Sequence, residues 1–382
     1  MKFDAIKSIE RENYDVIVVG GGIAGIAAAV SAAREGMKTF LIEKSFNLGG
    51  LATGGLISWY EPLCDGKGNQ MIFGIAEELI KLSAKYSFDT FPSEWGGDEK
   101  NAVKPHRRYG TYFSPTVFSA ALDKYVLESG AKLRFDTLAT YPVMEDNICK
   151  GVIVESVNGR EFFGAKIVID ATGDATIMHR AGVPTVMGKN YITYMVHYFD
   201  TDGVKKLYGD KDINAFRKWY NMGSNMNGVG HPEGKEMVVA DSSEVLTDYM
   251  TQGKLALIER IKEKDRNCFD VMALPSMPQL RTIRRIVGKC DFEAIDKKTY
   301  CDSIGTCGDF RPTGIGKHYQ IPFGALYNDK FPNLLAAGRI ISAPQGDAWE
   351  VSRVIPVCAL TGEAAGKAAA KCVTNGHDLN NM

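Results

Sequence analysis

The chain has 382 residues, with 45 Lys and Arg against 46 Asp and Glu, and a formal net charge of −1. This balance excludes a protein that depends on its overall charge to bind a polyanion or a membrane surface. Apolar residues make up 45% and charged residues 24%, which excludes wholesale disorder. Glycine is the one deviation, with 40 residues, about a tenth of the chain against a usual ~7%. This excess predicts places where the backbone turns sharply or lies against a ligand.

The eight cysteines and the N-terminus bear on the compartment. No C-x-x-C occurs, so the cysteines indicate neither a zinc site nor a thioredoxin-type pair. Residues 1–15 are polar and lack the apolar core of a signal peptide. No stretch approaches the ~18 apolar residues of a membrane span. We therefore predict a cytoplasmic protein with reduced thiols, no bound metal and no membrane association.

The first strong pattern is a βαβ unit over residues 14–44. Residues 16–19 form an apolar run that is typical of a strand buried on both faces. An alanine-rich helix is predicted over 24–34, with Gly36 at its end, and a second buried strand over 38–42. A right-handed crossover makes the two strands parallel.

The next segments alternate helix and strand less regularly. A short helix is predicted near 74–86, and a longer one over 114–130 because Ser114 suits the N-cap and Pro115 the first turn. The strands predicted after it are 132–136, 151–157 and 161–169, the last two joined by a turn at 157–159.

Past residue 190 the βαβ pattern disappears. Aromatic, Met and charged residues are interspersed up to about residue 320, whereas a buried-strand pattern returns at 334–337 and a final helix at about 354–374. We predict an α/β fold: a Rossmann-like cofactor-binding domain with a central parallel sheet and helices, interrupted by an inserted α+β substrate lobe. The predicted boundaries are 1–189 with 325–382 for the cofactor domain and 190–324 for the lobe.

A glycine motif lies between the first strand and the first helix. Gly20 permits the tight turn, Gly22 lets the backbone approach a pyrophosphate, and Gly25 lets the helix pack on the strand. The diphosphate then lies at the helix N-terminus, where free N–H groups and the dipole favour negative charge. Glu43, at the end of the second strand, can accept both ribose hydroxyls of an adenosine. The motif predicts a dinucleotide site, a signature that FAD and NAD share.

Three further glycine-containing segments bear on which dinucleotide is bound. Residues 49–55 (GGLATGG) carry two glycine pairs that suit a backbone pressed along an extended ribityl-diphosphate chain. An ordinary flexible loop is the alternative for this segment. Residues 169–174 (IDATGD) and 336–339 (AAGR) are each a strand running into a glycine turn. Strand ends at one sheet edge form a crevice for an extended cofactor.

With these motifs in this order, the sequence resembles the FAD-dependent oxidoreductase family of glutathione-reductase-type flavoproteins. The matching segments are 14–44, 49–55, 169–174, LRTIRRIVG at 280–288, IPFGAL at 321–326, LLAAGRIIS at 334–342 and SRVIPVCALTGEAAGKAAA at 352–370. The resemblance implies bound FAD, with the N-terminus of the last helix directed at the flavin N1–C2=O edge. The residues expected at the cofactor are Gly20, Gly22, Ile23, Ala24, Gly25, Glu43, Lys44, Gly49, Gly50, Leu51, Ala52, Thr53, Ala171, Thr172, Gly173, Asp174, Gly338, Arg339 and Pro356.

Departures from the family's motifs limit how this chain is expected to hold FAD and to transfer electrons. Residues 45–60 contain no cysteine pair of the kind that disulfide reductases carry, and Arg339 stands where those enzymes have Asp. Residues 44–56 contain no histidine for covalent attachment of FAD. A second NAD-type Rossmann unit is also absent. We therefore expect noncovalent FAD and no dithiol relay.

Four residues are candidates for catalysis. Arg281 and Arg285 share one face whether their segment is a helix or a strand, and arginine suits bidentate recognition of a carboxylate. His318 is a candidate acid or base, and Arg353 precedes the last helix. The alternatives are a solvated basic stretch for Arg281 and Arg285 and a structural, hydrogen-bonded role for His318.

These observations favour an FAD-dependent oxidoreductase that transfers a hydride between FAD and a small organic substrate, with an anionic one favoured. Two alternatives stay open: an FAD-dependent tRNA-modifying protein, and a flavin-binding protein without redox turnover. The first needs a basic surface, which a net charge of −1 does not provide, so we expect no nucleic-acid partner. The sequence leaves the oligomeric state open.

Overall fold

A computed structural model describes residues 8–97, 109–225 and 227–382. Its centre is a parallel sheet in the order β6-β3-β2-β9-β17. These strands span Tyr14–Val19 (β2), Thr39–Ile42 (β3), Lys132–Arg134 (β6), Gly159–Asp170 (β9) and Leu334–Ala336 (β17). The side chains of β2, β3 and β17 are almost all buried, as the apolar runs predict for strands covered on both faces.

Strand β9 connects the parallel and antiparallel parts of one eight-stranded sheet. Its residues 165–170 pair in parallel with β2 and β17, whereas residues 159–164 pair antiparallel with β8 (Ile148–Ser156). Strand β8 in turn pairs with β7 (Leu138–Glu145), and the short β1 (Ile9–Glu10) lies along the start of β9. The hairpin between β8 and β9 confirms the predicted turn, but strand β7 was not predicted, because its buried and exposed positions do not alternate regularly.

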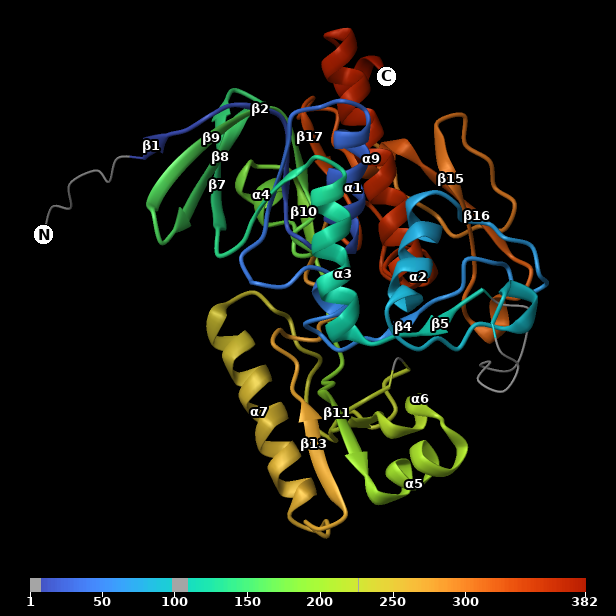
Figure 1. The fold of residues 1–382 in the computed structure, drawn as a ribbon. Coiled ribbons are helices and arrows are strands. Elements are labelled where there is room, and N and C mark those ends of the chain that lie inside the picture. The colour runs from blue at the N-terminus through green and yellow to red at the C-terminus, as the bar shows by residue number, and fades with distance from the viewer. Residues whose placement is uncertain (1–7, 98–108, 226) are drawn as a thin grey trace, which may run out of the picture.

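Two helices pack closely on one face of the parallel sheet. Helices α1 (Ile23–Arg34) and α9 (Ile355–Asn375) run side by side (Figure 1). A Cβ on Gly362 would lie 2.1 Å from the carbonyl oxygen of Ala24, so only glycine allows this approach. Helices α2 (Ile75–Lys85) and α3 (Pro115–Glu128) complete this layer. All four were predicted, with ends that differ by one or two residues.

The inserted lobe projects away from this core (Figure 1). It holds a three-stranded antiparallel sheet in the order β12-β11-β13, formed by Lys218–Asn221, Met195–Asp200 and Phe269–Ala273. Helix α7 (Ser243–Ile261) packs on one face of it through Leu257. Helices α5 (Thr201–Asp210) and α6 (Ile213–Phe216) follow β11.

The chain from β14 onward packs on the core and not in the lobe. Phe292, Cys307 and Tyr319 belong to the same buried cluster as Val16 of β2. We propose that the lobe proper ends near residue 283, earlier than the predicted 324. The remaining elements are β4 (Trp59–Tyr60), β5 (Thr111–Tyr112), α4 (Thr176–Arg180), β10 (Thr185–Met187), β14 (Arg284–Ile286), β15 (Ser303–Gly308), β16 (His318–Pro322), α8 (Asp347–Ser352), and the 3-10 turns η1 (Gly50–Ala52), η2 (Ser93–Trp95), η3 (Pro312–Gly314), η4 (Phe323–Leu326) and η5 (Leu379–Asn381).

The described part of the chain lacks both a helix suited to a membrane span and a cluster of side chains suited to a metal ion. None of its helices is long and apolar enough to cross a membrane. Within the same residues, no group of three or more His, Cys, Asp or Glu side chains is placed to hold a metal ion.

Candidate functional site

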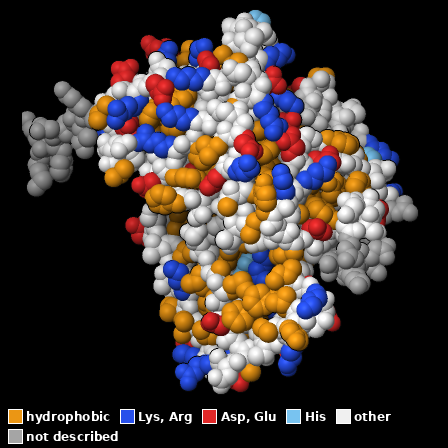
Figure 2. Space-filling view, viewed as in Figure 1, with side chains coloured by type: hydrophobic (Ala, Val, Ile, Leu, Met, Phe, Trp, Pro, Cys, Tyr) orange, Lys and Arg blue, Asp and Glu red, His pale blue; other side chains and the backbone are white. Residues whose placement is uncertain are grey.

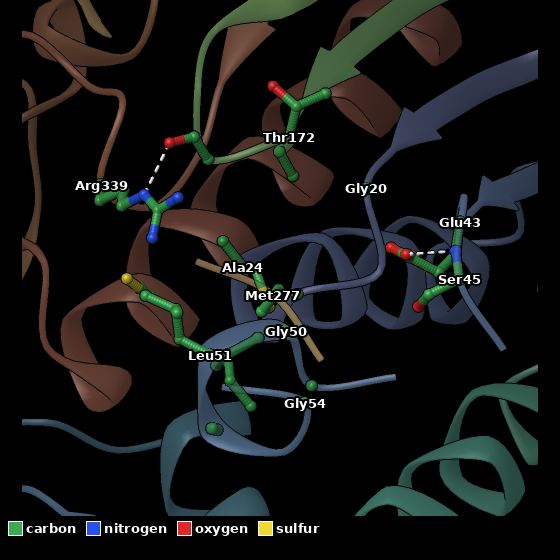
Figure 3. A pocket seen from close by; sticks show the side chains of 18 of the residues that line it. Gly20, Ala24, Glu43, Ser45, Gly50, Leu51, Gly54, Thr172, Met277 and Arg339 are labelled. Atoms are coloured by element: carbon green, nitrogen blue, oxygen red, sulfur yellow. Dashed lines mark hydrogen bonds between the residues drawn. The ribbon is translucent and has the colours of Figure 1, made fainter. Parts of the chain in front are cut away.

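A cleft lies at the carboxyl ends of the parallel strands. It has a volume of about 1060 Å³, including space open to solvent. Because β2, β3, β9 and β17 are parallel, the turns that follow them meet at this one edge (Figure 3). The residues that line the cleft are Gly20, Gly22, Ile23, Ala24, Glu43, Lys44, Ser45, Asn47, Gly49, Gly50, Leu51, Ala52, Gly54, Ala171, Thr172, Gly173, Ser276, Met277, Ala337, Gly338, Arg339, Arg353, Ile355 and Cys358.

The three glycines of the first turn have different surroundings. Gly20 has a φ of +102°, and a Cβ there would lie 2.6 Å from the carbonyl oxygen of Ala171. A Cβ on Gly25 would lie 1.8 Å from the carbonyl oxygen of Gly20, which no side chain tolerates. A Cβ on Gly22 would meet no atom within 4 Å and would enter the cleft. Gly20 and Gly25 therefore serve the fold, and Gly22 leaves the cleft open to a ligand.

The predicted loop over 49–55 lies directly against this turn. The N–H of Gly49 donates to the carbonyl oxygen of Gly21 at 2.8 Å, and Gly22 and Gly49 form a parallel bridge. A Cβ on Gly50 would lie 3.2 Å from the Cα of Gly22. The hydroxyl of Thr53 donates to the carbonyl oxygen of Leu48 at 2.5 Å, inside the loop. Thr53 thus shapes the loop and does not line the cleft.

Glu43 lies in the cleft just beyond β3 (Figure 3). Its Oε2 accepts a hydrogen bond from the N–H of Gly21 at 2.6 Å, and its Oε1 accepts one from the N–H of Ser45 at 2.8 Å. Each carboxylate oxygen retains a further lone pair, so the group can still accept from ribose hydroxyls. The hydrogen bonds fix the orientation that the sequence motif requires.

The turn after β9 depends on a buried carboxyl group. Asp170 is fully buried and accepts hydrogen bonds from the N–H of Thr172 at 3.0 Å, its hydroxyl at 2.6 Å and the N–H of Met178 at 2.9 Å. Burial raises the pKa of Asp170 to about 6. Thr172 and Gly173 line the cleft, whereas Asp174 turns away and accepts from the N–H of Thr176 at 3.1 Å.

Arg339 reaches from the turn after β17 to the turn after β9. Its Nε donates to the carbonyl oxygen of Gly173 at 2.6 Å (Figure 3), and its Nη1 donates to that of Leu280 at 3.1 Å. Burial lowers the pKa of the guanidinium. No carboxylate of the described residues forms an ion pair with it. A cation in a partly buried cleft without a counter-ion suits an anionic ligand.

The N-terminus of α9 closes one end of the cleft. Arg353 forms an ion pair with Glu350, yet its buried Nε has no hydrogen-bond partner. The N–H of Ile355 donates to Oε2 of Glu61 at 3.4 Å. Burial raises the pKa of Glu61 to about 7. Sequence reasoning missed Glu61, because it lies in a segment without a motif.

Of the four predicted catalytic residues, two lie at or near the cleft and two lie away from it. Arg353 lines the cleft, and burial together with the nearby charge of Arg353 lowers the pKa of Arg281. Arg285 instead pairs with Asp291 at 3.4 Å, and His318 with Asp65 at 3.2 Å. Neither Arg285 nor His318 lines the cleft, and their catalytic roles stay predictions.

The lobe contributes residues that the sequence did not indicate. The N–H of Ser276 donates to the carbonyl oxygen of Gly54 at 2.9 Å. The buried side chain of Gln279 donates to the carbonyl oxygens of Gly55 at 2.7 Å and Met195 at 3.0 Å. The contacts with Gly54 and Gly55 join segments more than 200 positions apart, and no local pattern marks them. The lining residues absent from the predicted set are Ser45, Asn47, Gly54, Ser276, Met277, Ala337, Ile355 and Cys358.

The features of the cleft fit FAD. Bare backbone at Gly22 and Gly50 leaves room for an extended diphosphate, and Arg339 and Arg353 offer positive charge that the described residues only partly neutralise. The predicted cofactor residues outside the lining are Gly25, Thr53, Asp174 and Pro356, and each lies in or next to a segment that lines the cleft.

Comparison with known proteins agrees with this fit. The FAD dependent oxidoreductase family matches residues 15–231 and 231–382. Digeranylgeranylglycerophospholipid reductase of Methanoculleus marisnigri is 28% identical over 201 residues, which cover 50% of this chain and 47% of that protein. The chain thus spans about half the length of this curated relative.

Two solved structures share the fold. A geranylgeranyl bacteriochlorophyll reductase-like protein of Thermoplasma acidophilum aligns with a TM-score of 0.50 and 17% identity over 96% of this chain and 80% of its own. The myxobacterial chondrochloren halogenase CndH aligns with a TM-score of 0.51 and 14% identity over 97% of this chain and 77% of its own. At these identities the likeness shows the fold alone.

Proposed function

The chain belongs to the FAD dependent oxidoreductase family, and from this premise we propose that it is an oxidoreductase that transfers a hydride between a small organic substrate and noncovalently held FAD. The observation that carries the proposal is the cleft at the strand ends, where two glycine loops leave the backbone bare. We further propose the glutathione-reductase-type arrangement of this cofactor site, which rests on the order of the sequence motifs.

Each cofactor contact that we propose follows from a group in the cleft. Glu43, held by two backbone N–H groups, accepts the ribose hydroxyls. The bare backbone at Gly22 and Gly50 lies along the diphosphate, and Arg339 neutralises its charge. The N-terminus of α9 stabilises negative charge on the flavin ring through its dipole. When bound, FAD supplies a hydride acceptor or donor.

The proposed substrate end lies where the lobe meets α9. Arg281 and Arg353 lie there with Glu350, which forms an ion pair with Arg353, so one positive charge remains and favours an anionic substrate. Glu61, whose pKa is raised to about 7 by burial, is able to hold or release a proton near neutral pH. These residues would orient the substrate and move its proton.

The curated relative supplies a candidate substrate class. Its name is that of a reductase of an isoprenoid glycerophospholipid, and the lobe of this chain exposes large apolar side chains such as Tyr208, Ile213 and Met272. Reduction of an unsaturated lipid is therefore our second candidate. The tRNA-modifying alternative has weaker support, from a tRNA uridine modification enzyme that is 29% identical over 184 residues but of which this chain covers only 25%. The non-turnover alternative has no comparable observation in its favour.

Purification tests the proposal directly. We expect a yellow protein that releases free FAD on acid denaturation and bleaches on reduction by dithionite. Colourless protein that fails to bind added FAD would contradict the assignment. Flavin that stays with the denatured chain would contradict noncovalent binding, and colour that no tested organic substrate bleaches would support the alternative without turnover.

A further inference from the structure

The three-stranded sheet of the lobe has two different faces. Val196 and Tyr220 lie on the face covered by α7, together with Leu257 of that helix. Side chains alternate along a strand, so His197 and its cross-strand partner Trp219 lie on the opposite face. This second face is directed at the core, because His197 contacts Leu56 and Ser58.

His197 joins the lobe to the loop of the cofactor cleft. It is 1% exposed, and its Nε2 lies 3.1 Å from the carbonyl oxygen of Leu56 and 3.5 Å from the hydroxyl oxygen of Ser58. Burial lowers the pKa of His197 to about 4, so the imidazole is neutral at physiological pH. Gly54, two residues before Leu56, lines the cofactor cleft. The second face of the lobe therefore begins where the cofactor loop ends.

Aromatic rings from the core and the lobe form a continuous row beside His197. Ring centroids are 4.6 Å apart for Trp59 and Tyr112, and 5.5 Å apart for Tyr112 and Trp219. The Trp219 ring is parallel to that of His197, at 6.4 Å. Trp219 is 37% exposed, so the row is open to solvent at its Trp219 end. We call Trp59, Tyr112 and Trp219 the aromatic row.

Arg217 stands at the edge of this row and carries an uncompensated charge. Its Nη2 donates to the carbonyl oxygen of Phe113 at 2.6 Å, and its Cζ lies 5.2 Å from the centroid of the Phe88 ring. Its Nε is buried without a partner. No carboxylate among the described residues pairs with it. Burial lowers its pKa to about 10, which leaves it positively charged at neutral pH.

A buried charge without a counter-ion is costly to the fold. A ligand that brings an anion would remove this cost and also satisfy the free Nε. Carboxylate and phosphate groups match the fork of a guanidinium. The surface is hollowed between the core and the lobe, and apolar side chains gather on the lobe below the hollow (Figure 2).

We propose that Arg217 binds an anionic group, a carboxylate or a phosphate, of a substrate whose flat apolar body lies against the aromatic row. This inference rests on the proposed function and names the anchor of its substrate. Arg217 acts here as a binding and specificity residue. It is distinct from Arg281 and Arg285, the arginines that the sequence favoured for this task.

Calorimetry on the FAD-loaded protein tests the proposal with benzoate, phenyl phosphate and neutral benzamide as probes. We expect at least one anion to bind about 10-fold or more tighter than benzamide, because a charge-assisted pair is worth that much or more. Preference for benzoate would identify a carboxylate, and preference for phenyl phosphate a phosphate. Equal binding of all three probes would overturn the proposal.

Two variants test whether Arg217 itself, and not positive charge on the lobe in general, binds the anion. Arg217→Met should weaken anion binding roughly 10- to 100-fold and leave benzamide unaffected. Arg260→Met removes an exposed cation of the same lobe and should change neither. If Arg217→Met does not fold, Arg217→Lys keeps the charge but loses the fork, and a clear loss of anion affinity is still expected. Unchanged affinity in the folded variant overturns the proposal.

The absorbance of bound flavin, measured in every sample, distinguishes failure of the proposed function from failure of the Arg217 assignment. Wild-type protein that binds no FAD would contradict the proposed function. FAD-loaded protein that shows no preference for the anions would contradict only the assignment of Arg217. Quenching of tryptophan fluorescence by the anions supports binding at the aromatic row, and quenching that persists in Arg217→Met contradicts it.

Discussion

The cofactor cleft is shaped mainly by the main chain, whereas the surface around Arg217 is formed by side chains. Main-chain turns and glycines shape the cleft, and the ends of parallel strands bring them together. The surface around Arg217 consists of side chains from segments near residues 58, 88, 112, 197 and 217. A main-chain site depends on where a Cβ is absent, whereas a side-chain site depends on which charges are left without partners. Substitutions should therefore act differently in the two regions.

Glycine substitutions in the cleft should have the largest effects, and of two kinds. Gly25→Val forces a side chain against the carbonyl oxygen of Gly20, so we expect the free energy of unfolding to fall by about 3 kcal/mol or more. Gly22→Val projects into open space, so we expect a folded protein that has lost FAD, with affinity at least ~100-fold weaker. Urea unfolding and flavin titration measure the two effects.

A third glycine provides the control. Gly209 lies in α5, and a Cβ added there would meet no atom within 4 Å, so Gly209→Ala should preserve both stability and flavin binding. Normal FAD affinity in Gly22→Val would contradict the assignment of this turn to the cofactor.

Acid should destabilise the junction through His197. The folded pKa of about 4 lies below the ordinary value near 6.5, so between these pH values only the unfolded chain gains a proton. The stability from the neutral imidazole is complete above pH 6.5 and is lost as the pH falls towards 4, by roughly 3 kcal/mol. His197→Gln should remove this pH dependence, as urea unfolding at pH 7 and pH 4 would show.

The control for this experiment is His179→Gln, which removes an exposed histidine of α4. It should retain the wild-type pH dependence. Identical slopes for wild type and His197→Gln would show that this imidazole does not couple protonation to folding.

Removing the cation of Arg339 should weaken FAD binding without loss of the fold. Loss of a charge-assisted contact with the diphosphate predicts affinity roughly 10- to 100-fold weaker in Arg339→Met. Flavin titration of the apoprotein measures this change. Arg180→Met, at an exposed position of α4, is the matched control. Equal FAD affinity in both variants would remove Arg339 from the proposed site.

The smallest effect is expected at His318. Its hydrogen bond with Asp65 lies outside the cleft and should contribute less than ~1 kcal/mol, because His318 is partly exposed. We expect His318→Gln to bind FAD normally and to be reduced by substrate at the wild-type rate. A large loss in the rate of flavin reduction would restore the catalytic role that the sequence favoured.

The sequence predictions succeeded where neighbouring residues determine a feature, and were harder where residues distant in the chain determine it. Helices α1, α3 and α9 were predicted to within two residues, because caps, prolines and glycines mark their ends locally. Most of the predicted cofactor residues line the cleft for the same reason. Strand β7 was missed because it has no local signal, and the lobe boundary stays a prediction.

Side-chain partners were the least predictable features. Arg281 and Arg285 are alike in sequence, yet Arg285 pairs with Asp291 while Arg281 lies near Arg353. Arg217 carried no motif at all, and only the packing of the lobe on the core shows that its Nε is buried without a partner and that no carboxylate of the described residues pairs with it.

The sequence by itself determined the parallel sheet, the two glycine loops and the acid at the end of β3, because a missing Cβ and an apolar strand are properties of consecutive residues. Only the tertiary structure decided which cations form no ion pair with the residues that it describes and which carboxyls are buried, as at Arg217 and Glu61. Charge compensation and desolvation depend on neighbours that are distant in the chain, and folding alone brings those neighbours together.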